Sequence, residues 1–234
     1  MLFSGGTRAV ITTATSVTVI DISTGTQTGT TLTVTAGRPI ETLLTADGTH
    51  VLVTTTRRSW FDPAVTATPI ALIDLTTGTQ VGTTLSLVGD TYASPAFTAD
   101  GTRAFISTVV DNPTTGVSTT RVTTIDSATG MPIGTTVTLS GALASGIDNP
   151  LRVVLSPDGA RALLATNSGG YPGTTQVAMI DTRTGKKIGD TVAIDGALSR
   201  LRWSTDGTRV FVTTYITTST GADLNIRETV LTPF

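Results

Sequence analysis

The chain has 234 residues, of which 14% are charged, with a formal net charge of −2 and no cysteine. This length is sufficient for one all-β domain with a sizeable core. The charge excludes the basic surface of a duplex-binding protein, so no nucleic acid partner is expected. The missing cysteines exclude disulfides and cysteine-based zinc sites. No apolar run is long enough to predict a membrane span.

Threonine supplies most of the polarity and makes up roughly a quarter of the chain. Its β-branched side chain favours strands and keeps their exposed faces polar. The first clear strand is residues 17–21, Val-Thr-Val-Ile-Asp, in which threonine alternates with aliphatic residues. The composition therefore predicts an all-β fold.

One hairpin signal recurs five times along the chain. It consists of a short apolar strand, a turn that ends in Asp-Gly or a degenerate equivalent, and a second apolar strand. The glycine supplies the positive φ that closes such a hairpin. The repeat units start near residues 4, 45, 98, 156 and 204.

The second strand of each unit is an apolar run rather than an alternation of apolar and polar residues. The clearest runs are residues 51–53, 104–106, 163–165 and 210–212. Such a run indicates a strand that is buried on both faces, as in sheets that stack face to face.

A third strand follows a connection of variable length and ends in Ile-Asp or its equivalent. It leads into a second constant turn, Asp-x-x-Thr-Gly, which begins at Asp21, Asp74, Asp126 and Asp181. We expect each carboxylate to accept hydrogen bonds from turn amides and each glycine to be left-handed. A fourth strand, such as residues 133–139, closes the unit.

Units of roughly 40 to 60 residues with four short strands each predict the blades of a β-propeller. We expect residues 1–234 to form a single propeller domain of about five four-stranded antiparallel blades. The end blades are incomplete, since only residues 1–3 precede the first turn and a third strand at 226–231 is the last. Three arrangements are compatible with the sequence: a closed five-blade ring, a piece of a larger ring, and two chains that complete one another. The third would make the protein an oligomer.

The repeat resembles the YVTN-type, WD40-like β-propeller repeats of bacteria. The resemblance rests on the Ser-Pro-Asp-Gly turn at 156–159, the strand at 211–214, and the strand at 17–21 with its Thr-Gly turn at 24–25. This chain departs from the pattern by having Thr or Ser where a final Asn is usual, except at Asn167. The resemblance implies a secreted or envelope-associated protein. The first residues have no signal-peptide pattern, and a cytoplasmic location stays open.

Variation in length is confined to the second-to-third and fourth-to-first connections, which lie on one face of a propeller. Loops on a rigid scaffold usually carry binding residues, so this irregular face is expected to bind a protein or an envelope component. Trp60 and Arg58 are its most distinctive residues, because Trp and Arg are common interface anchors. Trp60 and Phe61 could instead cap the blade below them. The candidate binding residues are Arg57, Arg58, Trp60, Phe61, Tyr92, Tyr171, Arg152 and Arg200.

Arg152 and Arg200 belong to first strands, which line the channel of a propeller. Together with the nearby Arg202 they could hold an anion, but pairing with Glu41 or another carboxylate is the preferred interpretation. The single histidine, His50, occupies a position that is arginine in the other units, which favours a structural role. No catalytic residue, metal site or cofactor is expected.

The sequence therefore favours a non-catalytic interaction or scaffold module. A structural blade array within a larger surface protein is one alternative. The other is a carbohydrate-active five-bladed enzyme, which would need paired carboxylates at the rim. Its candidate carboxylates are Glu41, Asp90, Asp111 and Asp148.

Overall fold

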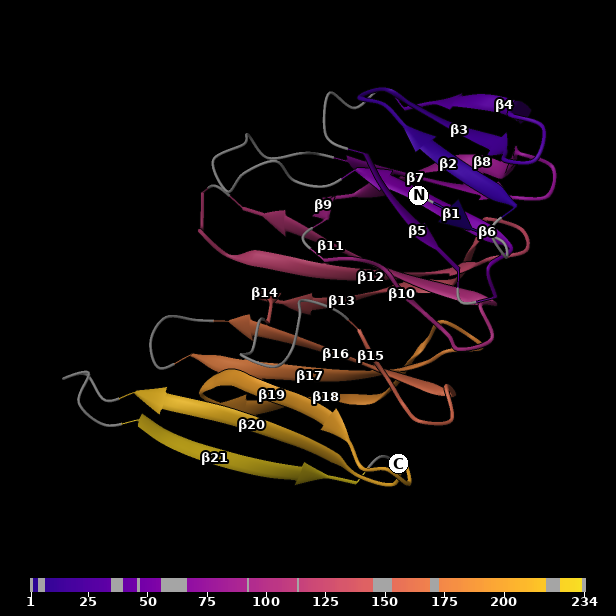
Figure 1. Cartoon of the computed structure of the whole chain (residues 1–234). Coiled ribbons are helices and arrows are strands. Elements are labelled where there is room, and N and C mark those ends of the chain that lie inside the picture. The colour runs from indigo at the N-terminus through magenta and orange to yellow at the C-terminus, as the bar shows by residue number, and fades with distance from the viewer. Residues whose placement is uncertain are drawn as a thin grey trace. The chain divides into compact units, whose positions relative to one another are not determined.

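The structure is a computed structural model of the chain. It describes every residue except 1, 4–6, 35–39, 46, 56–66, 92, 113, 145–152, 169–172, 218–223 and 233–234. The described residues form strands and turns, and no helix occurs among them (Figure 1). It follows that none of these residues lies in a helix capable of crossing a membrane.

The chain divides into two compact units. Unit 1 comprises Met1–Thr91, Phe97–Ala104 and Ile125–Pro132, and unit 2 comprises Tyr92–Ala96, Phe105–Thr124 and Ile133–Phe234. The longer strands of every sheet form a meander, in which strands that follow one another in sequence pair with one another. This is the strand order that the repeated hairpin signals predict.

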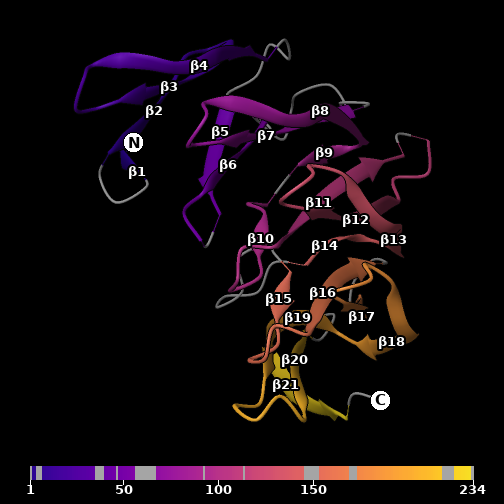
Figure 2. The same ribbon diagram turned by 90° about the vertical axis from the view of Figure 1, so that its right-hand side faces the viewer.

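Unit 1 contains two four-stranded sheets, which Figure 2 shows at the N-terminal end of the chain. The first sheet consists of β1 (Leu2–Phe3), β2 (Arg8–Thr12), β3 (Ser16–Asp21) and β4 (Thr26–Thr33). The second consists of β5 (Ile40–Leu44), β6 (His50–Thr55), β7 (Ala67–Asp74) and β8 (Thr79–Val88). A third sheet contributes residues to both units and has β9 (Asp90–Thr91), β10 (Ala96–Phe97), β11 (Arg103–Asp111), β12 (Ser118–Asp126) and β13 (Pro132–Ser140).

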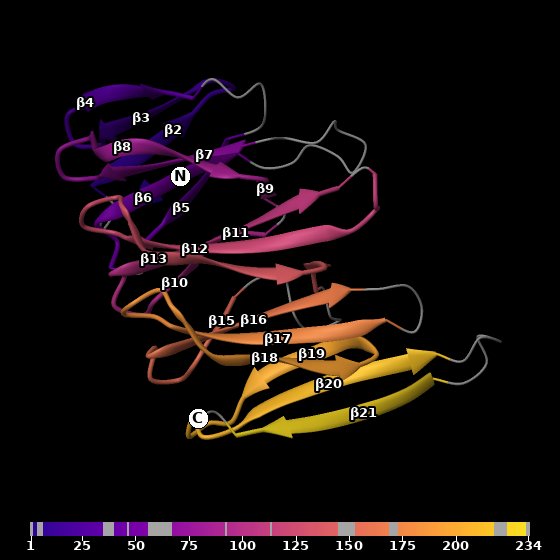
Figure 3. The same ribbon diagram turned by 180° about the vertical axis from the view of Figure 1, so that it is seen from behind.

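Unit 2 contains the fourth and fifth sheets, which lie against each other in Figure 3. The fourth sheet consists of β14 (Ala142–Leu143), β15 (Val154–Leu155), β16 (Arg161–Ser168), β17 (Thr174–Asp181) and β18 (Lys187–Asp195). The fifth has three strands among the described residues: β19 (Ala197–Trp203), β20 (Val210–Thr217) and β21 (Leu224–Leu231).

The fourth sheet is apolar on both faces, as its second strand predicts. Ala162 and Leu164 of β16 belong to a cluster shared with the third sheet, and Leu163 and Ala165 belong to one shared with the fifth. All four residues are at most 5% exposed. Since each buried leucine contributes about 1.5–3 kcal/mol, stacking of the sheets supplies the core.

The two end sheets differ from this pattern. Arg8 is the strand partner of Asp21 in the first sheet, as Arg161 is of Asp181 in the fourth. Ile11 and Leu164 follow these arginines by the same number of residues and therefore hold the same repeat position. Ile11 is 51% exposed, whereas Leu164 is fully buried. In β20, Val210, Val212 and Thr214 are buried, but Phe211 is only half-buried. The expectation that 210–212 is buried on both faces is therefore wrong, because no described sheet covers the outer face.

The fourth-to-first connections are more regular than expected. The three that the structure describes at this point each begin with one glycine, Gly89, Gly141 or Gly196, at φ 101, 99 and 98 respectively. A β-carbon on Gly141 would lie 2.3 Å from the Asn167 carbonyl oxygen, so only glycine fits there. A buried threonine donates to each glycine carbonyl: Thr68 to Gly89, Thr120 to Gly141 and Thr175 to Gly196.

Irregularity lies instead inside the first strands. The first strand of the fourth sheet is split into β14 and β15, which pair with opposite ends of β16. The first strand of the fifth sheet, β19, is continuous, with a register shift between Leu198 and Arg200. Residues 142–143, which the sequence assigns to a loop after the fourth strand, therefore pair with β16 as part of the first strand.

Candidate functional site

The Asp-Gly turns are held by carboxylates that accept hydrogen bonds from their own turn. Asp206 accepts from the Ser204 hydroxyl at 2.5 Å, the Thr208 amide at 3.0 Å and the Thr208 hydroxyl at 2.8 Å. Gly207 follows at φ 69. These bonds, chiefly that of Ser204, lower the pKa of Asp206 from 3.8 to about 2. Equivalent bonds lower the pKa values of Asp100 and Asp158.

The Asp-x-x-Thr-Gly turns behave as predicted. Asp74 accepts hydrogen bonds from the amides of Thr76 at 2.6 Å and Thr77 at 3.0 Å, and Gly78 has a φ of 65. Asp126 repeats the arrangement with two amides at 2.9 and 3.0 Å. In the first unit, the Ser23 hydroxyl is the main cause of a pKa of about 2 at Asp21. The recurring aspartates thus act as turn anchors.

Arginines connect the two kinds of turn in some of the units. Arg8 pairs with Asp21, and Arg103 pairs with Asp126 at 2.9 Å. His50 has the same place in the second sheet, opposite Asp74, and its Nδ1 lies 2.6 Å from the Thr49 hydroxyl. These contacts support the structural interpretation of His50 and of the repeated aspartates.

The aspartate anchors make stability depend on pH. Because the pKa of Asp206 in the folded chain lies below its ordinary value, its contribution is present above about pH 4 and is lost as pH falls toward about 2. Ser204→Ala removes the main cause, so we expect its Asp206 pKa to return toward 3.8. Carboxyl titration by NMR measures this, with Asp100 as the internal control. An unchanged Asp206 pKa in the variant would refute the assignment.

Most of the candidate binding residues lie outside the described residues. This applies to Arg57, Arg58, Trp60, Phe61, Tyr92, Tyr171 and Arg152, and also to the carboxylate Asp148. Their grouping on one face stays a prediction. Arg200 is described and is exposed on β19.

The other carboxylates proposed for an enzyme site have contrasting environments. Asp90 is only 4% exposed and lies in β9, where the sequence predicts a loop. Asp111 is exposed at the end of β11 and accepts a 2.7 Å hydrogen bond from the Ser118 hydroxyl. Glu41 is half-buried in β5. Within the described part of the chain, no three His, Asp or Glu side chains are grouped as metal ligands.

Asn167, which the other repeat units replace by Thr or Ser, joins two sheets of unit 2. Its side-chain oxygen accepts from the Thr175 hydroxyl and from the Leu198 amide, both at 3.2 Å. Thr175 belongs to β17 and Leu198 to β19, so the amide side chain fixes the start of the fifth sheet. This explains the residue structurally.

The outer face of the fifth sheet is a surface that sequence reasoning missed. Arg202 lies 4.0 Å over the ring of Phe211 and 3.5 Å from Glu228. Along β21, Ile226 is 67% exposed and Val230 is 49% exposed. The available signal was the alternation of apolar and polar residues that begins at Leu224.

Solved structures show what fold this chain resembles. It is similar to hydrazine synthase of Kuenenia stuttgartiensis, with a TM-score of 0.52 and 19% identity over 99% of this chain and 61% of that chain. It also aligns with the β-propeller domain of the trilobed protease from Pyrococcus furiosus, with a TM-score of 0.47, 10% identity and coverage of 93% and 59%. The β-propeller domain of Cps50 (Swd1) from Myceliophteria thermophila gives a TM-score of 0.45, 14% identity and coverage of 99% and 71%.

The chain thus spans less than two thirds of the length of the first of these proteins. No family model and no curated protein sequence matches it. At these identities the likeness concerns the fold alone. Consecutive antiparallel meanders, with apolar faces stacked within each unit, make the chain an all-β protein of the β-propeller fold class, as predicted.

Proposed function

We propose that the chain is a non-catalytic β-propeller scaffold that binds a protein or envelope component through the loops between second and third strands. One observation carries this proposal. The charged side chains that recur from unit to unit hold the turns together, as in the Arg103–Asp126 pair. The repeat units differ in the length and sequence of the loops between second and third strands, at the opposite end of each sheet. Binding residues usually lie on such loops.

The connection between β6 and β7 is the proposed centre of this surface. It carries Arg57, Arg58, Trp60 and Phe61, and aromatic and arginine side chains dominate interface hot spots. The likeness of the repeat to YVTN-type propellers supports a secreted or envelope-associated location.

The test is capture of a cross-linked partner from a cell-envelope extract by the tagged chain. We expect the double variant Arg58→Ala, Trp60→Ala to reduce capture about tenfold or more, since such anchors are each worth about 2 kcal/mol or more. The matched control is Lys186→Ala, Lys187→Ala, at the opposite end of the fourth sheet. Equal capture by the parent and the Arg58, Trp60 variant, with unfolding curves unchanged, would contradict the proposal.

A structural blade array is the second candidate, and the exposed outer faces of the end sheets favour it. Ile11 on the first sheet and Ile226 on the fifth are both more than half exposed, at 51% and 67%. In the fourth sheet both faces are covered by neighbouring sheets. Faces of this kind suit a polypeptide in which further repeat units continue the stack.

A further inference from the structure

The hairpin between β17 and β18 differs in charge from its repeats. Residues 182–187, which we call the cationic hairpin, contain Arg183 and the only two lysines of the chain, Lys186 and Lys187. The equivalent residues are Ser23, Thr26 and Gln27 in the first unit, Thr76, Thr79 and Gln80 in the second, and Ala128, Met131 and Pro132 in the third. The three cations thus stand where the equivalent hairpins carry no charge.

The turn of the cationic hairpin closes without help from these cations. Asp181 accepts hydrogen bonds from the Thr184 amide at 2.7 Å and the Thr184 hydroxyl at 2.9 Å. Asp126 makes the same two bonds in a hairpin that has no cation at these positions. The turn also packs on the third sheet, since a β-carbon on Gly185 would lie 2.3 Å from the Ile133 carbonyl oxygen. The hairpin is therefore a fixed support, and its cations call for a role outside the turn.

Other basic residues lie at the same end of unit 2. Arg161 begins β16 opposite Asp181, and Arg209 is exposed just before β20. The two Asp-Gly turns of this end lie side by side, because a β-carbon on Gly207 would lie 3.5 Å from Cδ of Pro157. The turns and their flanking residues carry more cations than carboxylates, namely Arg161, Arg183, Lys186, Lys187 and Arg209 against Asp158, Asp181 and Asp206.

The turn end of unit 1 has the opposite balance of charge. Its two arginines pair with turn carboxylates, Arg8 with Asp21 and Arg103 with Asp126. The described turns of this end carry more carboxylates than cations, namely Asp21, Asp47, Asp74, Asp100 and Asp126 against Arg8 and Arg103. The excess of positive charge among the described turns is therefore a property of unit 2.

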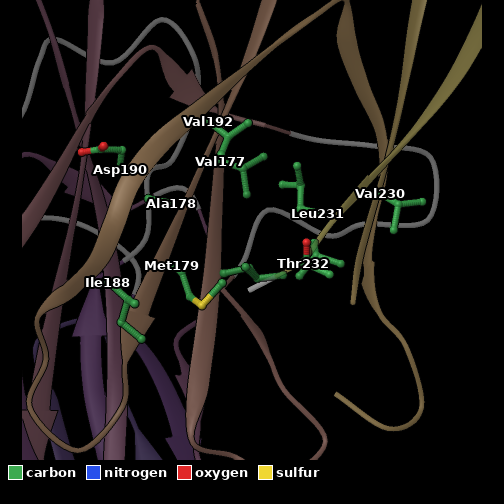
Figure 4. Close-up of a pocket in the computed structure, with 11 residues that line it drawn as sticks. Val177, Ala178, Met179, Ile188, Asp190, Val192, Val230, Leu231 and Thr232 are labelled. Carbon is green, nitrogen blue, oxygen red and sulfur yellow. The ribbon is translucent and has the colours of Figure 1, made fainter. Parts of the chain in front are cut away.

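The cationic hairpin is a convex surface. Arg183, Lys186 and Lys187 are all exposed. Further along β18, Ile188 and Val192 line a pocket of about 210 Å³, and the described residues around it include no lysine or arginine (Figure 4). The partner of the cations therefore presents its negative charge on its own surface. Residues 182–187 also contain no apolar or aromatic side chain that could serve as the buried anchor of a protein interface.

We propose that the cationic hairpin docks on an anionic lipid surface, with the headgroup phosphates against Arg183, Lys186 and Lys187. Anionic headgroups form a plane of mobile charge, so exposed cations on a convex tip bind them without a shaped pocket. Each basic residue near such a surface strengthens association about fivefold. The docking surface lies at the opposite end of the sheets from the loops of the proposed function and does not depend on that function.

The test is flotation of the full chain with vesicles of phosphatidylglycerol and phosphatidylcholine in equal parts. We expect binding to these vesicles but not to pure phosphatidylcholine, and we expect high salt to abolish it because salt screens exposed charges. The variant Arg183→Thr, Lys186→Thr, Lys187→Gln carries the residues with which the second unit closes the same turn. It should unfold as the parent does and bind the anionic vesicles about a hundredfold more weakly.

A charge-balanced chain is the matched control. It adds Thr76→Arg, Thr79→Lys and Gln80→Lys to that variant, so the net charge of the parent is restored at the turn end of unit 1. This chain is expected to stay as weak as the variant, because carboxylates outnumber cations at that end. Recovery of parent binding would show that net charge, and not the cationic hairpin, determines association.

Three further outcomes would overturn the proposal: no binding to the anionic vesicles, equal binding to pure phosphatidylcholine, or equal binding by the neutral variant. The first two need no variant and so do not depend on its folding. Binding of soluble polyglutamate without vesicle binding would assign the hairpin to an acidic polypeptide instead. The Arg58→Ala, Trp60→Ala chain should bind vesicles as the parent does, whereas Lys186→Ala, Lys187→Ala should lose vesicle binding and keep capture of the protein partner, which separates the two tests.

Discussion

Replacement of Gly78 by alanine is expected to lower the free energy of unfolding by about 2–5 kcal/mol, the sum of a left-handed backbone penalty and an overpacking penalty. Its φ is 65, and a β-carbon there would lie 1.9 Å from the Thr28 carbonyl oxygen in the neighbouring sheet. Because the obstructing atom belongs to the backbone, the sheets must move apart to relieve the contact. The Thr30 amide, which donates to the Gly78 carbonyl at 3.2 Å, loses its partner when they do.

Gly25 provides a control at the same repeat position. Its φ is 67, but a β-carbon there would have nothing within 4 Å. Gly25→Ala is therefore expected to cost only the backbone penalty of about 1–2 kcal/mol. Urea unfolding followed by circular dichroism measures both variants. Equal losses at Gly25 and Gly78 would show that the contact between sheets contributes nothing beyond backbone conformation.

The second large effect is expected for Leu164→Ala, which should cost about 2–5 kcal/mol because it opens a cavity in a packed interior. Leu164 is fully buried in the cluster between the third and fourth sheets. Ile11 holds the same repeat position in β2 but is 51% exposed. Ile11→Ala is therefore expected to cost about 1 kcal/mol or less, since little area is lost from the interior.

The urea midpoints of these two variants report on the outer face of the first sheet. A small loss of stability in Ile11→Ala, together with a large loss in Leu164→Ala, agrees with an end sheet that has one exposed face. A loss at Ile11 as large as that at Leu164 would mean that another surface covers Ile11 in solution.

The local chemistry of the repeat could be predicted from sequence. The turn at Asp158-Gly159 depends on hydrogen bonds that reach no more than five residues along the chain, such as those of Ser156 with Asp158 and Arg161. The turn at Asp74 is equally local. Because the partners in these hydrogen bonds are close in sequence, they appear together as a recognisable motif. The turns, the strand order and the fold class could therefore be predicted from the repeated motif.

Contacts between sheets could not be predicted in the same way. The Gly29–Gly78 approach and the Asn167–Leu198 hydrogen bond join residues that are far apart in sequence. The meaning of Gly141 was missed for the same reason, because the atom that excludes a side chain belongs to Asn167. The candidate loop site, centred on Trp60, stays a prediction.

The glycine contact has a consequence for how such a chain can vary in length. Several junctions between neighbouring sheets are made by equivalent residues, Gly78 on Thr28 in one case and Gly185 on Ile133 in another. A duplicated gene segment that encodes one whole unit would thus bring both halves of a working junction with it. The number of repeats can therefore change by recombination without a compensating substitution elsewhere. A substitution of a junction glycine, in contrast, would be copied with the repeat and would weaken each contact between sheets in which the copied residue takes part.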